Sequence, residues 1–122
     1  MVAKILCVDD EELLLSSLKR ILENAGFQVS TAFDANEGIE LCRITQFDLV
    51  LSDQQLPGMS GLEFLEVLRE ISPQTMRIIL SGKTSLPLAR KALMQETIMG
   101  YIRKPWKNEE LITTIEGFLK KS

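Results

Sequence analysis

Five side chains with carboxylate, hydroxyl or amine groups stand where short apolar runs of this sequence end. They are Asp9, Asp10, Asp53, Ser81 and Lys104. If these runs are parallel strands of one sheet, the five side chains meet at its carboxyl edge, where open α/β sheets bind their ligands. Carboxylates held close together repel one another, and Mg²⁺, which prefers oxygen ligands, relieves that repulsion. The set predicts a magnesium site at which a carboxylate accepts a phosphoryl group, with an ammonium and a hydroxyl group to contact its oxygens.

Each of these residues, taken alone, has a simpler structural explanation. Asp9 and Asp10 suit the N-cap and first turn of a following helix, where acidic side chains are favoured. Asp53 and Ser81 suit turns, and Lys104 suits a solvated surface. Coincidence at four separate strand ends is improbable, so the combination favours a functional site over five unrelated residues.

Apolar or alternating runs predict the strands that must position these side chains, over residues 4–8, 28–32, 48–52, 76–80 and 98–102. Helical periodicity and capping signals predict helices over residues 11–25, 35–44, 60–72, 85–93 and 108–119. Strands and helices that alternate with short connections indicate an α/β fold, with a parallel sheet covered by helices on both faces. No linker or repeat interrupts the pattern, so residues 1–122 are expected to form one domain.

Composition narrows the classes of function. Of the 122 residues, 45% are hydrophobic, which is typical of a globular core and too many for a disordered tail. The formal charge of −3 argues against direct contact with nucleic acid, because binding to a phosphate backbone needs a basic patch. Histidine is absent, which excludes a histidine triad and a histidine zinc site. Any phosphohistidine donor must therefore be another protein or domain.

Cysteine usage and hydropathy bear on the compartment. Cys7 and Cys42 are too far apart for a metal motif, and a reduced, buried thiol is expected at Cys7. No stretch approaches the roughly 20 apolar residues that span a bilayer. No signal peptide is recognisable at the start of the chain. These features indicate a cytoplasmic protein with no membrane contact.

From end to end the sequence resembles a response-regulator receiver domain of two-component signalling, in particular the chemotaxis-regulator type. The matching motifs are Val8-Asp9-Asp10-Glu11, the stretch from Asp53 through Leu56-Pro57-Gly58-Met59-Ser60-Gly61, Leu80-Ser81-Gly82 and Tyr101-Ile102-Arg103-Lys104-Pro105. The resemblance implies a doubly wound sheet of order 2-1-3-4-5, which is a flavodoxin-like three-layer sandwich. It also implies a phosphorylation-activated switch, not an enzyme that turns over an external substrate.

The resemblance assigns the phosphorylation chemistry to three residues, with Asp53 as the phosphoacceptor and with Lys104 and Ser81 contacting the phosphoryl group. The Lys104–Pro105 peptide bond is expected to be cis, an isomer that proline makes accessible. On phosphorylation Ser81 would move toward the phosphoryl group, and Tyr101 would rotate into the space behind it. The surface of the fourth helix, fifth strand and fifth helix would change as the protein shifts between two packings.

The resemblance also implies the magnesium ligands. Asp10, Asp53 and the backbone carbonyl of Gln55 would bind Mg²⁺ directly, and Asp9 would act through a bound water. Gln55 and Lys83 would border the path of the water that hydrolyses the aspartyl phosphate. We therefore expect these two side chains to set the lifetime of the phosphoryl group.

The partners implied are a histidine kinase or phosphotransfer protein as donor, and an output domain or effector protein as target. The kinase would dock near the first helix, where Leu13, Leu14 and Leu15 cannot all be buried. Dimerisation on phosphorylation stays open, as do the identity of the output and the cognate kinase.

Other function classes compete with this interpretation. A haloacid-dehalogenase-type phosphatase also forms an aspartyl phosphate, but it needs a second aspartate at the position of Gln55. A nucleotide-binding protein needs a glycine-rich phosphate loop after the first strand, where Asp9 and Asp10 stand instead. The main alternative is a pseudo-receiver, a binding module that has the fold and is not phosphorylated. The presence of all five site residues argues against it.

Overall fold

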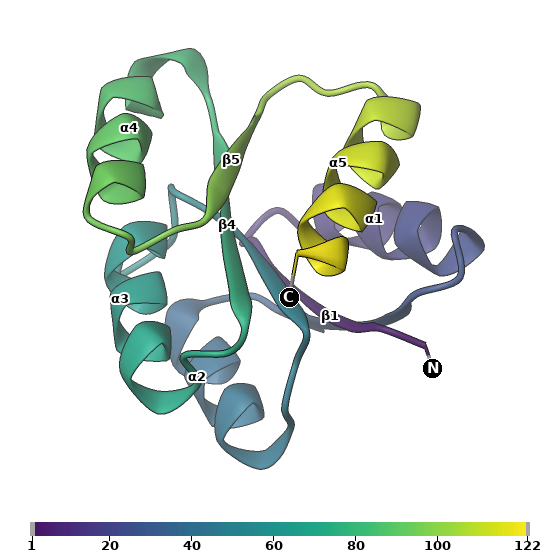
Figure 1. Ribbon diagram of the computed structural model, residues 1–122, viewed down its shortest axis with the longest axis horizontal. Helices are drawn as coiled ribbons and strands as arrows, with labels where there is room; N and C mark the ends of the chain where they lie inside the picture. Colours follow the sequence, from purple (N-terminus) through teal and green to yellow (C-terminus); the bar gives the residue numbers. More distant parts are fainter. Residues whose placement is uncertain (1, 122) are drawn as a thin grey trace.

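Strands and helices alternate along the chain in the computed structural model, which describes residues 2–121 except for the side chain of Lys83 (Figure 1). The strands are β1 (Lys4–Val8), β2 (Gln28–Ala32), β3 (Leu49–Asp53), β4 (Met76–Ser81) and β5 (Gly100–Arg103). The helices are α1 (Glu12–Asn24), α2 (Ala35–Ile44), α3 (Gly61–Ile71), α4 (Leu86–Met94) and α5 (Asn108–Lys120). A short 3₁₀ turn, η1 (Lys83–Ser85), precedes α4.

The five strands form one parallel sheet of order β2-β1-β3-β4-β5, which confirms the predicted topology. From β1 the chain crosses to β2 at one edge, and it then returns to place β3 on the other side of β1. The two strands at this change of direction pair side by side, with Val8 opposite Ser52. A crevice at the carboxyl ends of such strands is where doubly wound folds bind ligands.

Helices cover both faces of the sheet, so the domain has three layers (Figure 1). Helices α1 and α5 pack on one face, and α2, α3 and α4 pack on the other. Successive side chains of β1 alternate between the two cores: Ile5 and Cys7 belong to the first, whereas Leu6 and Val8 belong to the second. Because both faces are covered, the central strands are apolar almost throughout.

Capping residues and a glycine stand at three helix ends. Asp34 accepts a hydrogen bond from the backbone N–H of Glu37 at the start of α2. Ser60 and Glu63 form a reciprocal capping box at the start of α3. Gly26, with a positive φ of 101°, follows the end of α1, a backbone conformation that glycine adopts without strain.

Several element ends differ from the predicted ones by one or two residues. Asp53 and Ser81 are the last residues of β3 and β4 instead of the first residues after them. The ladder continues to Asp53 opposite Leu80 and to Ser81 opposite Arg103. The predicted strand 98–102 lies at Gly100–Arg103, since pairing with β4 fixes where it begins. The backbone of Asp53 and Ser81 is thus held by the sheet.

Both cysteines are free, and burial raises the pKa of the Cys7 thiol to about 12, so the expected reduced and buried thiol is present. No helix within residues 2–121 is long and apolar enough to span a bilayer.

Candidate functional site

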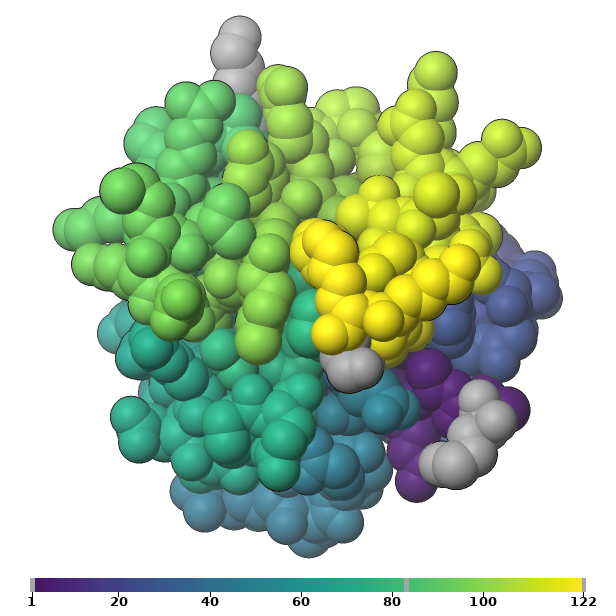
Figure 2. Space-filling view, in the orientation of Figure 1, coloured from purple at the N-terminus to yellow at the C-terminus, as the bar shows by residue number. Residues whose placement is uncertain are grey.

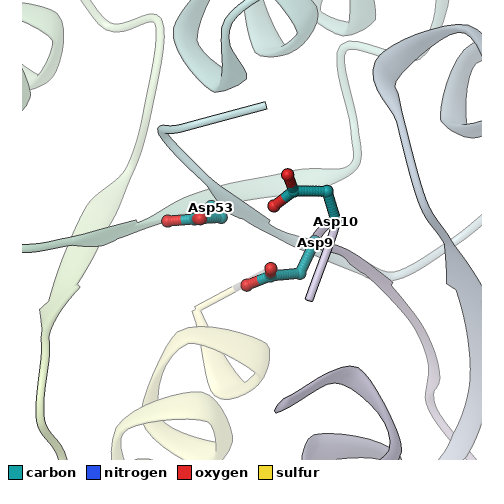
Figure 3. Close-up of side chains that lie close together, drawn as sticks. All are labelled: Asp9, Asp10 and Asp53. Carbon is teal, nitrogen blue, oxygen red and sulfur yellow. The ribbon is translucent and has the colours of Figure 1, made fainter. Parts of the chain in front are cut away.

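The sheet brings the three acidic residues together at its carboxyl edge (Figure 3). Asp9 and Asp10 follow β1, and Asp53 ends the neighbouring β3. A carboxylate oxygen of each residue lies within 4.8 Å of one from each of the others. Figure 3 shows the side chains extending from two strands toward a common space. Asp10 is exposed, whereas Asp9 and Asp53 are buried, so the cluster opens to solvent on the Asp10 side.

Lys104, just after β5, supplies the positive charge of the site. Its Nζ lies 2.9 Å from Oδ1 of Asp53, which accepts a hydrogen bond from it, and 3.9 Å from Oδ2 of Asp9. The neighbouring Lys104–Pro105 peptide bond is cis. The backbone N–H of Lys104 donates to the carbonyl oxygen of Ser81, which joins the ends of β4 and β5.

Asp9 is the most constrained member of the cluster. Its side chain is 0% exposed, and Oδ1 accepts a hydrogen bond of 2.9 Å from the backbone N–H of Glu11. Oδ2 is buried and has no hydrogen-bond partner among the described residues. Burial, followed by repulsion from Asp53, raises the pKa of the Asp9 carboxyl to about 6, although the bond from Glu11 and the charge of Lys104 oppose this rise. A buried carboxylate oxygen without a partner is an unfavourable feature that a ligand would relieve.

These residues fit a divalent cation with oxygen ligands. Three carboxylates face one ammonium group, which leaves two formal negative charges for a cation to balance at pH values where all three are ionised. Oδ2 of Asp9 adds an acceptor that receives no hydrogen bond from the described residues, although Lys104 Nζ lies 3.9 Å away. Mg²⁺ binds through a few carboxylates and keeps several waters, which suits a cluster that is open on one side.

The loop after β3 is anchored by residues whose roles the sequence analysis missed. The Gln54 side chain accepts a hydrogen bond from the backbone N–H of Leu62, and the Gln54 carbonyl accepts one from Gly61. Gly61 lies so close to Asp53 that a Cβ atom there would overlap the Asp53 carbonyl. The predicted ligand Gln55 is exposed in this loop. Residue type alone does not separate it from its neighbour Gln54, which holds the loop.

The two predicted switch residues lie on neighbouring strands. The Ser81 hydroxyl is buried and bonds to the Ser85 hydroxyl and the Gly82 carbonyl. Tyr101, on β5, is half-buried against the core that α2, α3 and α4 cover. Lys83, the second predicted lifetime residue, has its side chain outside the described part of the structure. Ser85, whose hydroxyl bonds to that of Ser81, is a residue that the sequence did not point to.

Comparisons with known proteins agree with this geometry. A profile of the family "Response regulator receiver domain" matches residues 5–116. The chain is 36% identical over 113 residues to the hydrogenase transcriptional regulatory protein HoxA of Cupriavidus necator, covering 93% of this chain and 23% of that protein. Among solved structures, a response regulator receiver domain protein from Clostridium thermocellum shares 34% identity at a TM-score of 0.91, covering 98% of this chain and 96% of that one.

A second solved structure, a CheY-like response regulator receiver domain protein from Methanospirillum hungatei, shares 33% identity at a TM-score of 0.92. It covers 99% of this chain and 96% of that one. The chain spans about half, or less, of the length of the curated relatives that it matches first.

Proposed function

Since this chain belongs to the response regulator receiver domain family of two-component systems, we propose that it is a switch set by phosphorylation of Asp53 in the presence of Mg²⁺. Receiver domains of response regulators are signalling switches and not turnover enzymes. The observation that carries the proposal is the convergence of Asp9, Asp10 and Asp53, with Lys104 already bonded to Asp53.

Asp53 is the nucleophile in this proposal. One of its carboxylate oxygens attacks the phosphorus of a phosphohistidine or acyl phosphate. The bond between phosphorus and the donor atom breaks, and the donor leaves with that electron pair. Lys104, now bonded to Oδ1 of Asp53, then pairs with a phosphoryl oxygen, and the hydroxyl of Ser81 donates to another. The buried backbone of β3 holds Asp53 in place for this attack.

The acidic residues hold the metal. Asp10, Asp53 and the backbone carbonyl of Gln55 would bind Mg²⁺ directly, with Asp9 acting through water. When bound, Mg²⁺ supplies positive charge that offsets the repulsion between a carboxylate and an incoming phosphate. The unpartnered Oδ2 of Asp9 and the exposure of Asp10 support this assignment, because they give the cluster one unmet acceptor and one side open to solvent.

The response of the protein is a change of surface on the side of α4, β5 and α5. Ser81 moves toward the phosphoryl group and Tyr101 rotates toward the space that it leaves, which shifts the balance between two packings. In the space-filling view the green side chains around α4 and the yellow side chains of α5 lie on the same visible face (Figure 2). A partner or output domain that contacts this face would sense the change.

The phosphoryl donor is another protein or domain, because this chain has no histidine. A histidine kinase or phosphotransfer protein would dock beside α1. Leu13 on that helix is 87% exposed. A hollow of about 430 Å³ lies beside α1 and is lined by Glu11, Leu14, Lys104, Pro105 and Trp106. The hollow borders the Lys104 side of the site, so a protein seated there would reach Asp53.

Incubation with acetyl phosphate and Mg²⁺, followed by intact-mass measurement, tests the proposal. We expect one phosphoryl adduct on the wild type and none on Asp53→Asn. Asp48→Asn is the matched control, because it changes an exposed acid near the opposite end of β3. Its adduct should match that of the wild type. An unmodified wild-type protein, with its fold verified by circular dichroism, would instead indicate a binding module that is not phosphorylated.

A further inference from the structure

We infer that Ser85 is a positioning residue that restrains the hydroxyl of Ser81 and thereby sets how readily Asp53 is phosphorylated. The inference rests on the proposed function, because Ser81 is the residue expected to contact the phosphoryl group. It is carried by a closed set of hydrogen bonds that joins Ser81, Gly82 and Ser85.

The two hydroxyl groups and one carbonyl form a triangle. Ser81 Oγ lies 2.8 Å from Ser85 Oγ and 3.2 Å from the carbonyl oxygen of Gly82, which also lies 3.1 Å from Ser85 Oγ. Both serines are buried, so water competes poorly for these bonds. Among the described residues, no hydrogen bond joins the Ser81 hydroxyl to Asp53 or Lys104. The Ser81 hydroxyl is therefore hydrogen-bonded within the segment that joins β4 to α4 and not to the acidic cluster.

Ser85 occupies the N-cap of α4 without capping it. Serine at this position usually accepts a hydrogen bond from a backbone N–H of the first turn. The Ser85 side chain accepts none. Pro87, the second residue of α4, has no N–H to donate. The contacts of the Ser85 hydroxyl are thus with Ser81 and Gly82, not with its own helix.

Counting the hydroxyl protons shows that leaving the triangle costs Ser81 a hydrogen bond and leaves Ser85 with one. Each hydroxyl has one proton. Either Ser81 donates to Ser85, which donates to the Gly82 carbonyl, or Ser85 donates to Ser81, which donates to that carbonyl. In both arrangements Ser81 must break a buried hydrogen bond before it can donate to a phosphoryl oxygen. Ser85 keeps the Gly82 carbonyl as a partner after Ser81 has left.

Ser85 therefore opposes the movement of Ser81 toward the phosphoryl group. The same bond joins the last residue of β4 to the residue just before α4, so its rupture releases the start of that helix. Leu88 in the first turn of α4 is exposed, which places the released segment at the surface. Ser85 would in this way couple the state of Asp53 to the position of α4.

The test compares rates of phosphorylation by acetyl phosphate in the presence of Mg²⁺. Ser85→Ala leaves Ser81 only its longer bond of 3.2 Å to the Gly82 carbonyl. The lost bond is worth about 1 kcal/mol, or roughly fivefold in rate, so the rate constant of Ser85→Ala should rise by up to about that factor. Ser85→Thr keeps the hydroxyl and should restore the wild-type rate. In a Ser81→Ala background, Ser85→Ala should have no further effect, because its target is gone.

Two results would overturn the inference alone: equal rates for wild type and Ser85→Ala, or an unchanged Ser85→Ala effect in the Ser81→Ala background. The second result would mean that Ser85 acts on helix α4 and not through Ser81. A wild-type protein that takes no phosphoryl group overturns both this inference and the proposed function. If Ser85→Ala loses helical content, Ser85→Cys replaces it, because a thiol fills the buried space, although sulfur is larger than oxygen, and forms a weaker hydrogen bond. The expected direction is the same.

Discussion

At the scale of single residues, Asp9 lowers the stability of the metal-free fold. Its carboxyl is buried with one oxygen unpartnered, and burial raises its pKa to about 6. Above pH 6 the carboxyl is ionised in both the folded and unfolded protein, and the folded state bears the full desolvation cost. As the pH falls from 6 toward 4, the folded protein takes up a proton that the unfolded chain does not yet bind. The metal-free fold then regains the stability that Asp9 costs it.

Asp9→Asn should therefore stabilise the metal-free protein. We expect a gain of about 1–2 kcal/mol in the free energy of unfolding at pH 7.5, because the amide keeps the acceptor for Glu11 and removes the buried charge. Urea denaturation in the presence of a chelator measures it. The gain should shrink toward zero at pH 4. A loss of stability at both pH values would show that the charge of Asp9 is not the source of the cost.

We predict that the side chains of Gln55 and Lys83 set the lifetime of the phosphoryl group on Asp53. If their side chains restrict the path of the hydrolytic water, replacing both with alanine should shorten the half-life of phosphorylated Asp53 several-fold. Loss of the adduct, followed by mass after removal of the donor, gives the rate. The exposed pair Gln74 and Lys19, changed in the same way, is the control and should leave the rate unaltered. Equal half-lives for the test and control proteins would exclude this role.

At the scale of elements, the junction between β3 and α3 holds Asp53 in position. Gly61, the first residue of α3, lies against the carbonyl of Asp53, and its N–H donates to the Gln54 carbonyl. The side chain of Gln54 accepts from the N–H of Leu62. The start of α3 is thus fixed to the end of β3 by the backbone of Gly61 and by the side-chain amide of Gln54.

Gly61→Ala should disrupt this junction. The new Cβ would overlap the Asp53 carbonyl, so the helix must move, and we expect a loss of about 2–4 kcal/mol in unfolding free energy. Gly117→Ala in α5 is the matched control. A Cβ there meets nothing within 4 Å, and alanine should add about 0.5–1 kcal/mol through helix propensity. Urea denaturation of both variants measures the contrast, and similar effects would contradict it.

At the scale of the whole molecule, two cores hold the sheet rigid while the charged edge is left open. Side chains of α1 and α5 fill one core, and those of α2, α3 and α4 fill the other. The backbone positions of the three acids are therefore fixed by both layers. Their repulsion is stored in the fold, so a cation that binds the folded state should stabilise the entire domain.

Addition of Mg²⁺ should raise the melting temperature of the wild-type protein. At tenfold excess over the dissociation constant the gain is about 1.4 kcal/mol, or a few degrees, and a chelator should reverse it. Because the metal competes with the proton of Asp9, the shift should weaken below pH 6. Sodium chloride at equal ionic strength is the control for screening. Equal shifts from both salts would argue against a specific site.

Local sequence patterns are enough to predict the elements and the edge at which the acids meet. Apolar runs mark the strands, and helical periodicity and capping signals mark the helices, so the elements were predicted to within one or two residues. Strands that alternate with helices must be parallel, which brings the ends of β1 and β3 together once the order is known.

Which atoms meet at that edge depends on the three-dimensional fold and not on local patterns. The bond from Lys104 to Asp53, the orphaned oxygen of Asp9 and the pairing of Ser81 with Ser85 depend on register and loop geometry. These contacts span strands that lie far apart in sequence or follow the exact path of one loop, and a shift of about 1 Å would break them. Residue types and spacing carry no such detail, because a hydrogen bond is set by positions in space.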